Sequence, residues 1–172
     1  MDTETTGDEA AGAGRETAGA PVAQTRCGAV RGRTVAGVHV FRGIPYGGPR
    51  EGPGRFMPPR PPRPWSGVKE ATTTGPRRPQ PPGTLFDTVI GDYFSGGRTD
   101  RMGLRDQTDS ENCLVLNVLT PGLDDGKRPV LVYIHGGGFS VGSGVIGVVA
   151  DDLPREQDVV LVSVNHRVNA FG

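Results

Sequence analysis

The 172-residue sequence has little cysteine, few aromatic residues and no long hydrophobic run. Its two cysteines, Cys27 and Cys113, make neither a disulfide scaffold nor a metal framework. A membrane-spanning helix is excluded because no run of about 18 apolar residues occurs. The first residues lack a basic segment followed by an apolar one, so no secretory signal is expected. A cytoplasmic location without a membrane partner is therefore the default expectation.

Glycine and proline, in contrast, are abundant, with 28 and 16 residues respectively. Twelve of the prolines fall between residues 45 and 82, and hydrophobic residues make up 34% of the chain. Together with the glycines, this apolar share is normal for a globular domain, so a uniformly disordered polymer is excluded. Residues 1–24 have almost no large apolar side chains and predict a disordered, acidic Gly/Ala-rich arm. Residues 25–172 are then expected to belong to one domain.

The formal net charge of zero hides three blocks of alternating sign. Residues 1–25 carry a net charge of −4, residues 26–105 one of +9, and residues 106–172 one of −5. A basic block is one signature of an anionic partner. No pattern of aromatic residues for base stacking accompanies the charge, however. We therefore favour surface arginines that pair with the acidic third block, and we expect no nucleic-acid partner.

Short strands are predicted on both sides of the proline-rich stretch. Residues 29–35 and 38–41 have the composition of two strands, with a turn at residues 36–37. A further strand is predicted at residues 113–119, where the sequence Thr120-Pro121-Gly122 stops it.

Residues 43–82 form a proline tract between these strands. Proline fixes φ and removes a backbone donor, so the tract should be extended over a surface, with turns and little regular structure. Phe56 and Trp65 are the large apolar side chains that we expect to anchor it. Residues 83–107 are a Gly- and Asp-rich connector without a clear pattern.

Two continuous apolar runs, at residues 130–134 and 159–164, have the pattern of strands covered on both faces. The 24 residues between them are far too many for a hairpin and long enough for a crossover. This spacing predicts a parallel pair in an α/β sheet with a right-handed connection. A helix near residues 145–156 would form the crossover, although Gly147 and Pro154 interrupt it.

The sequence His135-Gly136-Gly137-Gly138-Phe139 follows directly after the first of these runs. Consecutive glycines at the carboxyl end of a parallel strand let the backbone turn tightly and leave N–H groups facing a cleft. Acyl transfer needs such donors, because negative charge builds on the carbonyl oxygen in the transition state. The alternative is a tight structural turn. The buried strand before the glycines and the aromatic residue after them favour an oxyanion loop of the esterase type.

At this point the chain resembles the N-terminal part of the carboxylesterase type B family, the α/β-hydrolases that include carboxylesterases and cholinesterases. The resemblance covers about residues 28–172, and its motifs occur in family order. They are Phe41-Arg42-Gly43-Ile44-Pro45-Tyr46, Gly54-Arg55-Phe56, Pro58-Pro59, Pro64-Trp65-Ser66-Gly67, Gly75-Pro76, Pro79-Gln80, Ser110-Glu111-Asn112-Cys113-Leu114-Val115-Leu116-Asn117-Val118, the glycine sequence above, and Val164-Asn165-His166-Arg167-Val168 through Phe171-Gly172. The implied fold is the N-terminal part of an α/β-hydrolase, incomplete, with a mixed central sheet and N-terminal antiparallel strands.

The resemblance implies roles for five residues. Gly137 and Gly138 would supply two N–H groups of an oxyanion hole, and His135 would hold their loop. Arg55 and Glu111 would form a structural ion pair; the alternative is two separately solvated surface charges. The implied substrate is a small-molecule carboxylic ester, and no cofactor or metal is expected.

Two departures from the family pattern stand out. Relatives that have a disulfide pair the position of Cys113 with a cysteine about where Arg78 stands, so Cys113 is expected to be a free buried thiol that Cys27 cannot pair. The resemblance also places the nucleophilic serine beyond residue 172, with its histidine and acid. The expected chemistry is serine ester hydrolysis through an acyl-enzyme, with this chain inactive on its own and prone to aggregate through uncovered apolar faces. A non-catalytic binding role is the alternative.

Residues 138–142 also match Gly-x-Ser-x-Gly, and Ser140, Asp158 and His166 occur in the chain order of a hydrolase triad. An elbow serine lies on a strained turn directly between a strand and a helix, whereas Ser140 follows Ile134 by six residues. The acid and the histidine would lie at opposite ends of one strand, more than about 20 Å apart. We therefore reject this triad.

A dinucleotide-binding module is the alternative from another class. Residues 142–147 match Gly-x-Gly-x-x-Gly, and Arg167 follows the next strand, where it could bind a 2′-phosphate. The first of these glycines comes eight residues after the strand, too late for the fingerprint. The three histidines, His39, His135 and His166, show no metal-ligand spacing.

Overall fold

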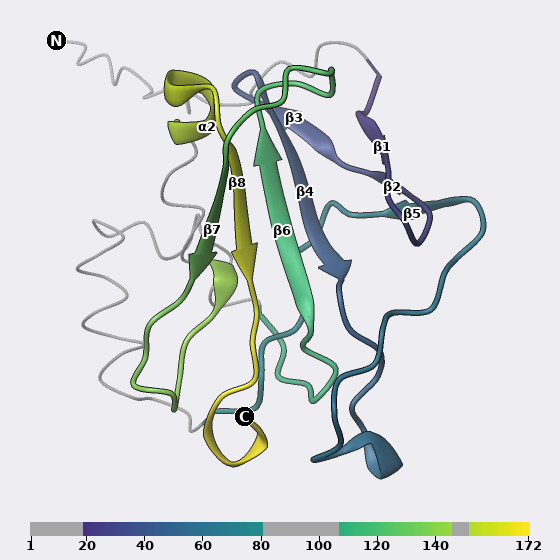
Figure 1. The fold of residues 1–172 in the computed structure, drawn as a ribbon, viewed down its shortest axis with the longest axis vertical. Coiled ribbons are helices and arrows are strands. Elements are labelled where there is room, and N and C mark those ends of the chain that lie inside the picture. The colour runs from purple at the N-terminus through teal and green to yellow at the C-terminus, as the bar shows by residue number, and fades with distance from the viewer. Residues whose placement is uncertain (1–18, 81–106, 146–151) are drawn as a thin grey trace, which may run out of the picture.

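A five-stranded sheet forms the centre of the molecule, and a three-stranded sheet lies at one side of it (Figure 1). The computed structural model describes residues 19–80, 107–145 and 152–172. The strand order of the larger sheet is β3-β4-β6-β8-β7. Its strands are β3 (Arg33–Val35), β4 (Val38–Pro45), β6 (Val115–Thr120), β7 (Val130–Ile134) and β8 (Val160–Val164).

The first strands depart from the prediction in one respect. A hairpin joins β3 to β4, and its turn residues Ala36 and Gly37 both have positive φ, 48° and 81°. This is the left-handed turn that the twist of two-residue hairpins favours, and the predicted turn is confirmed. The single strand expected over residues 29–35 is wrong, because it divides at Gly32. A side chain on Gly32 would collide with the carbonyl oxygen of Val40 and the ring of Phe41.

The smaller sheet contains β1 (Val22–Gln24), β2 (Ala29–Arg31) and β5 (Val68–Glu70). Its middle strand, β2, pairs antiparallel with β1 and parallel with β5. The arm predicted over residues 1–24 therefore extends too far, since its last residues are a paired strand. Composition missed β1 because the strand is short and half-exposed. Residues 1–18 lie outside the described residues.

The proline tract is mostly extended, as predicted, with a 3₁₀ turn at Gly52–Gly54 and the strand β5 as its regular elements in the described part. Trp65 anchors it: the indole N–H donates to the carbonyl oxygen of Ala29 at 2.9 Å, and the ring packs against the Val30 cluster. Phe56 is not a buried anchor. Its side chain is 68% exposed and stacks on Phe171, with 5.8 Å between the ring centroids.

The predicted parallel pair is confirmed, with β7 in register against β8 from Val130–Val160 to Ile134–Val164. On its other side, β8 pairs antiparallel with β6, which in turn pairs antiparallel with β4. The sheet is therefore mixed. The crossover contains the helix α2 (Leu153–Gln157), shorter than the segment expected, and residues 146–151 lie outside the described residues. So does most of the predicted connector over residues 83–107.

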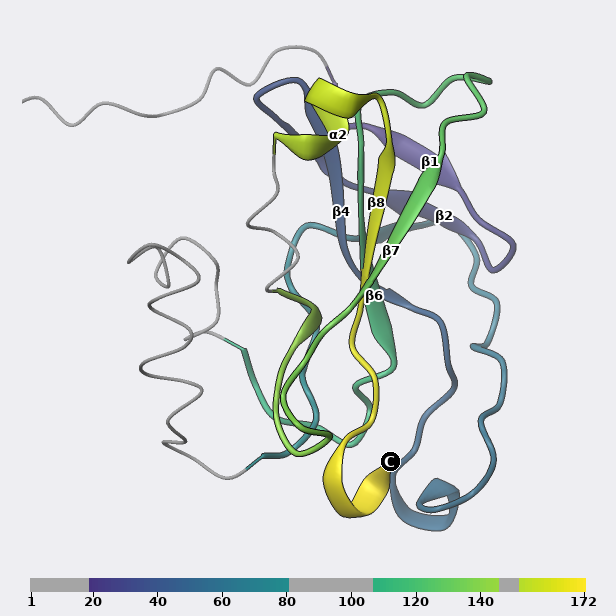
Figure 2. The ribbon, with the colours of Figure 1, turned by 60° about the vertical axis from the view of Figure 1, so that its left-hand side comes forward.

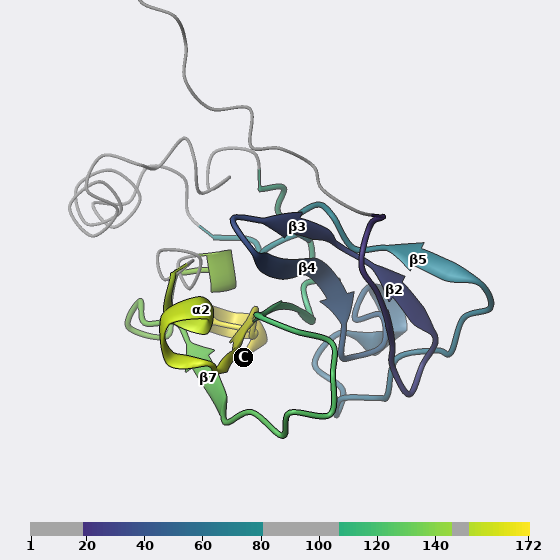
Figure 3. The ribbon, with the colours of Figure 1, turned by 90° about the horizontal axis from the view of Figure 1, so that it is seen from above.

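Burial is uneven across the central sheet. Val38, Val40, Leu119 and Leu161 form one buried cluster, and Phe41 packs with Val30 and Ala71 of the smaller sheet in another. The expectation that residues 130–134 are covered on both faces is wrong: β7 is the edge strand. Four of its residues are 49–67% exposed, namely Val130, Leu131, Val132 and Ile134. Figure 3 shows the smaller sheet on the β4 side of the molecule, away from β7.

The described helices are short, and none has the length and apolarity that crossing a bilayer requires.

Candidate functional site

Two segments meet at the end of the sheet where the parallel strands β7 and β8 finish (Figure 2). The glycine loop, which we define as residues 135–145, continues from β7, and residues 165–171 continue from β8. Because parallel strands carry their carboxyl ends to the same edge of a sheet, the sequence places these two loops side by side.

His135 lies at the base of the glycine loop. The residue is 5% exposed, its Nδ1 lies 2.9 Å from the carbonyl oxygen of Gly136, and its ring stacks on His166 with 4.0 Å between centroids. Burial lowers the pKa of His135, and the neighbouring His166 lowers it further, so the neutral imidazole is favoured. A neutral ring can donate from Nδ1 to this carbonyl oxygen at the start of the loop.

The next residues adopt backbone conformations that favour glycine. Gly137 has φ of 132° and Gly138 has φ of 59°. A side chain at Gly137 would collide with the carbonyl group of Val141, whereas nothing lies within 4 Å of the corresponding position on Gly138. The carbonyl oxygen of Gly137 accepts from the N–H groups of Ser140 and Val141, both at 3.1 Å.

The N–H groups of the two glycines differ from those of Ser140 and Val141, which donate within the turn. Within residues 19–80, 107–145 and 152–172, neither the N–H of Gly137 nor that of Gly138 donates a hydrogen bond. Gly138 is exposed and is followed by Phe139, which is 88% exposed. Backbone donors rarely lack partners unless solvent or a ligand accepts from them. The loop therefore has two adjacent N–H donors without a protein acceptor, one on a half-buried glycine and one on an exposed glycine.

A side-chain amide holds the second half of the loop. Gln80 donates through Nε2 to the carbonyl oxygen of Gly142 at 2.7 Å and accepts through Oε1 from the Gly142 N–H at 2.9 Å. Gly142 has φ of 123°, and a side chain there would collide with the His135 ring. The end of the proline tract thus fixes the loop by a two-point contact.

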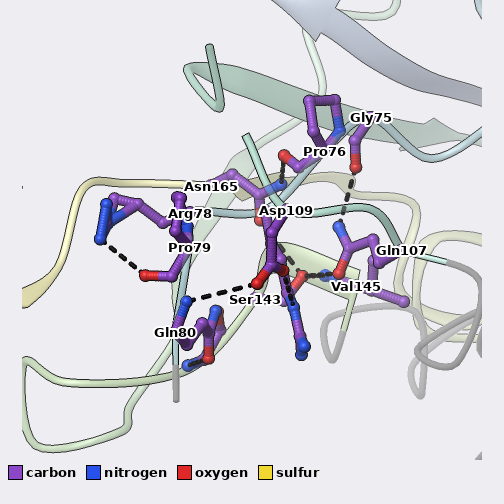
Figure 4. Close-up of polar contacts among 12 residues, drawn as sticks. Gly75, Pro76, Arg78, Pro79, Gln80, Gln107, Asp109, Ser143, Val145 and Asn165 are labelled. Carbon is purple, nitrogen blue, oxygen red and sulfur yellow. Dashed lines mark hydrogen bonds and ion pairs between the residues drawn. The ribbon is translucent and has the colours of Figure 1, made fainter. Parts of the chain in front are cut away.

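A buried polar network continues from this point (Figure 4). The Ser143 hydroxyl donates to Oε1 of Gln107 at 2.6 Å, and Gln107 donates through Nε2 to the carbonyl oxygen of Gly75 at 2.9 Å. Asn165 accepts from the Gly144 N–H at 2.6 Å and donates to the carbonyl oxygen of Pro76 at 2.9 Å. These amides join the loop to the segment after β8 and to the proline tract.

Sequence analysis missed these positioning residues. Gln80 and Asn165 lie within the motifs that carry the resemblance, yet nothing in their local pattern states what an amide there would contact. Gln107 lies at the end of the connector that has no clear pattern. What could have indicated their role is their residue type. A buried amide side chain almost always has hydrogen-bond partners, so an amide within a motif predicts such contacts.

The residues expected to form a structural ion pair are in contact, away from the glycine loop. Arg55 donates through Nε to Oε2 of Glu111 at 2.8 Å and through Nη2 to Oε1. This contact lowers the pKa of Glu111 and raises that of Arg55. The interaction joins the proline tract to the segment before β6.

Both cysteines are free, as expected. Cys113 is fully buried, which raises the pKa of its thiol, and Cys27 is half-buried. Arg78 is 2% exposed, and its positive charge acts on Cys113. Arg78 donates to the carbonyl oxygen of Pro79 and to Oδ1 of Asn169, so a charged side chain is buried close to where disulfide-containing relatives have their second cysteine.

The structure does not assemble the rejected triad. Ser140 donates to the carbonyl oxygen of Gly138, Asp158 accepts from Arg128 at 2.6 Å, and His166 stacks on His135. Asp158 precedes β8 and His166 follows it, at opposite ends of the strand. None of the three side chains contacts another in these interactions.

In the described part of the dinucleotide motif, three backbone N–H groups that could bind phosphate are already used. The N–H groups of Gly142, Gly144 and Val145 donate to Gln80, Asn165 and Ser143 respectively. Residues 146 and 147 lie outside the described residues. In the described part of the chain, no three His, Cys, Asp or Glu side chains are grouped so as to hold a metal ion.

Comparison with known proteins identifies the family. The family model described as "Carboxylesterase family" matches residues 19–172. A phenmedipham hydrolase of Pseudarthrobacter oxydans is 39% identical over 153 residues, which are 88% of this chain and 29% of that protein. The para-nitrobenzyl esterase of Bacillus subtilis is 36% identical over 152 residues, 88% of this chain and 28% of that protein.

Solved structures show the same relationship. A carboxylesterase of Geobacillus stearothermophilus, crystallised at pH 6.2, matches with a TM-score of 0.70 and 39% identity over 88% of this chain and 27% of its own. A para-nitrobenzyl esterase structure matches with a TM-score of 0.72 and 36% identity, over 88% and 28% of the two chains. The chain thus spans less than a third of the length of these relatives and has the α/β architecture of their N-terminal region. It belongs to the carboxylesterase family.

Proposed function

We propose that this chain forms the oxyanion-hole side of the active site of a carboxylic ester hydrolase. In the reaction, a serine attacks the ester carbonyl, the carbonyl oxygen becomes an oxyanion, and an acyl-enzyme forms and is then hydrolysed. The N–H groups of Gly137 and Gly138 would donate to that oxyanion. Preorganised donors of this kind are worth about 3–4 kcal/mol each in transition-state stabilisation.

One observation carries the proposal: among the described residues, the N–H groups of Gly137 and Gly138 have no protein acceptor, and they lie on a loop that hydrogen bonds hold at several points. The loop is held from below by His135, and from its second half by Gln80 and Asn165. Donors that are held in place before the substrate arrives need no reorganisation during the reaction, which is the condition for this form of catalysis. A purely structural turn gives no reason for two adjacent donors to be left without an acceptor.

The relatives' names support a small-molecule ester substrate, since they describe carboxylesterases and hydrolases. For the nucleophile, we propose a serine that is not among these 172 residues, together with its histidine and acid. By this proposal the polypeptide on its own hydrolyses no ester. A non-catalytic binding role remains the second candidate, and it predicts that the glycine loop can be altered without effect on any reaction.

A chimera tests the oxyanion role. Residues 19–172 would replace the corresponding region of the Bacillus subtilis para-nitrobenzyl esterase, and the product would be assayed with p-nitrophenyl acetate. We expect the chimera to hydrolyse this ester. Gly137→Ala should lower kcat by at least about tenfold, because the added methyl group displaces the turn that presents both donors.

Gly136→Ala is the matched control. Gly136 has no positive φ, and nothing lies within 4 Å of where its methyl group would be, so this variant should retain activity and folding. Equal activity of the Gly137→Ala and Gly136→Ala chimeras, with an unchanged fold, would contradict the oxyanion role.

The complementary assay uses the 172-residue chain alone, outside the chimera. We expect p-nitrophenyl acetate hydrolysis at the buffer rate, and no difference between the wild type and Ser140→Ala. Hydrolysis that depends on Ser140 would show that the rejected triad is active and would overturn our assignment of the nucleophile.

A further inference from the structure

A hollow lined by arginines lies between the proline tract and the segment after β8. Four guanidinium groups and one carboxylate line it together with two phenylalanine rings; the lining residues are Arg50, Arg55, Phe56, Arg78, Glu111, Arg167 and Phe171. Glu111 is bound at both carboxylate oxygens by Arg55. In the described part of the chain, the other three arginines form no ion pair. The hollow therefore has an excess of positive charge.

Arg78 contributes donors that have no acceptor. Its side chain is 2% exposed, and Nη2 donates to the carbonyl oxygen of Pro79 at 2.7 Å and to Oδ1 of Asn169 at 2.8 Å. Its Nε and Nη1 are buried and have no hydrogen-bond partner among the described residues. The ring of Phe171 covers one face of the guanidinium, with 4.0 Å from Cζ to the ring centroid.

Arg50 is buried in the same way. It is 3% exposed, and it donates through Nη1 to the carbonyl oxygens of Met57 and Pro58, at 3.1 and 2.7 Å. Its Nη2 lacks a partner in the part of the chain that the structure describes. Two buried guanidinium groups in one hollow thus keep unused N–H donors.

Buried charge without a counter-charge is costly, and each unpaired buried donor adds to that cost. Burial lowers the pKa of Arg78; Cys113, Glu111 and Asp109 oppose this shift in part, and the charge of Arg167 adds to it. A guanidinium nevertheless stays protonated in proteins, so the charge is not removed by loss of a proton. An anion that accepts from the unused donors would relieve both costs.

The size of the hollow limits which anion fits. The hollow has a volume of about 10 Å³ for a water-sized sphere, which is room for about one water molecule. A bulky anion cannot be enclosed, whereas one oxygen of a small planar oxyanion fits. Guanidinium groups bind carboxylates by paired N–H donors in one plane, which gives this class of ligand the geometric advantage.

We propose that this hollow is a binding site for a small free carboxylate, which accepts hydrogen bonds from the unused N–H groups of Arg78 and Arg50. Arg167 adds positive charge at the rim. This site is separate from the pair of N–H donors on the glycine loop, and it does not depend on the function proposed for that loop.

The site nevertheless contacts the glycine loop through one residue. Asn169 accepts from Arg78 and donates its backbone N–H to the carbonyl oxygen of Phe139 at 2.5 Å. An anion that holds the Arg78 guanidinium in place would also steady Asn169 and, through it, the residue after Gly138. Carboxylate binding should therefore slow amide exchange at Asn169, whose N–H makes this contact.

Thermal unfolding of the 172-residue chain tests the proposal, with formate as the probe. Sodium formate would replace sodium chloride stepwise at constant ionic strength. We expect the unfolding midpoint to rise with formate and to saturate, as binding to the native state alone requires. No rise, or a rise without saturation, would overturn the proposal. An equal saturable rise with phosphate would show a general anion site and contradict the carboxylate assignment.

Matched variants locate the effect. Arg78→Gln and Arg50→Gln should each weaken the formate response by about tenfold or more, because each removes a charge-assisted hydrogen bond. Arg63→Gln, an exposed arginine outside the hollow, should leave the response unchanged. A uniform loss in all three variants, or retention in all three, would contradict this site.

A second measurement uses only the wild-type protein, so it does not depend on whether a variant folds. In the wild type, the Nε–H resonance of Arg78, observed by NMR with ¹⁵N-labelled arginine, should shift saturably with formate. It should do so at the concentrations that raise the unfolding midpoint. An unmoved Arg78 resonance, in a protein whose midpoint does rise, would place the anion elsewhere and overturn the assignment.

Discussion

The two sides of the central sheet have similar apolar composition but opposite surroundings. On the covered side, formed by β4 and β6, Val38, Val40 and Leu119 are at most 5% exposed. At the open edge, formed by β7, Val130, Leu131, Val132 and Ile134 are 49–67% exposed. The covered side has the smaller sheet beside it, with Val30 and Ala71 packed on Phe41. An apolar run therefore predicts a strand, whereas the neighbouring elements determine how far that strand is buried.

The open edge is also the one that leads into the glycine loop. The loop does not depend on apolar packing around β7, because Gln80, Gln107 and Asn165 fix it through hydrogen bonds. One side of the molecule is thus stabilised by close packing and the other by amide contacts. The following predictions test this difference, beginning with the largest expected effect.

Leu119 and Leu131 provide a matched pair of leucines on the two sides. Leu119→Ala should lower the free energy of unfolding by about 2–5 kcal/mol, since the residue is fully buried opposite Val40. Leu131→Ala in β7 should change it by no more than about 0.5 kcal/mol. Urea unfolding measures both. Equal losses would mean that the open edge is covered in solution, and the comparison would fail.

The amide contacts should matter less than the packed core but more than the open edge. Asn165→Ala removes the acceptor of the Gly144 N–H and the donor to Pro76, both in a buried network, and should cost about 1–3 kcal/mol. Amide exchange at Gly144 should become faster in the same variant. Gln24→Ala, on the exposed strand β1, is the control and should do neither. An unchanged exchange rate at Gly144 would refute the anchoring role of Asn165.

The exposed strand β7 should drive self-association rather than stability. Val132→Lys adds a charge to the open edge, and it should reduce association measured by light scattering while it changes the free energy of unfolding by less than about 0.5 kcal/mol. Val35→Lys makes the same change on β3, where the valine is 45% exposed. If Val35→Lys reduced association as much as Val132→Lys, the open edge would not be the cause.

The smallest effect is expected at the Arg55–Glu111 ion pair, whose side chains are 46% and 17% exposed. Because the pKa of Glu111 is lowered in the folded state, its contribution to stability is present above the ordinary value of 4.5 and is lost as the pH falls through the folded pKa. Glu111→Gln should therefore lower the urea midpoint slightly at neutral pH and not at strongly acidic pH. A pH-independent difference would assign the effect to packing.

The sequence predicted those parts of the fold that depend on local pattern. The turn at Ala36-Gly37 follows from residues that tolerate positive φ, and the parallel pairing of β7 with β8 follows from two apolar runs with a long separation. The position of β7 at the edge could not be predicted, because an apolar run does not state how many neighbours the strand has. The division of the first strand at Gly32 depends on contact with Phe41, a tertiary feature.

At the candidate site, the glycine loop was located from its motif, and the structure adds what holds it. The amide side chains act across long separations in sequence, so no local window contains both partners of any of these contacts. Phe56 was expected to be buried because it is large and apolar, yet it lies exposed on Phe171. The burial of Arg78 could not be anticipated either, because arginine in a proline-rich stretch is normally solvated.

The contacts that hold the glycine loop also have a consequence for the order of folding. Gln80 and Gly142 are 62 residues apart, Ser143 and Gln107 are 36 apart, and Asn165 and Pro76 are 89 apart. Closing such distant contacts costs chain entropy that local contacts do not. The β3–β4 hairpin can therefore form early, whereas the glycine loop takes its final shape only after the proline tract and the segment following β8 have both arrived.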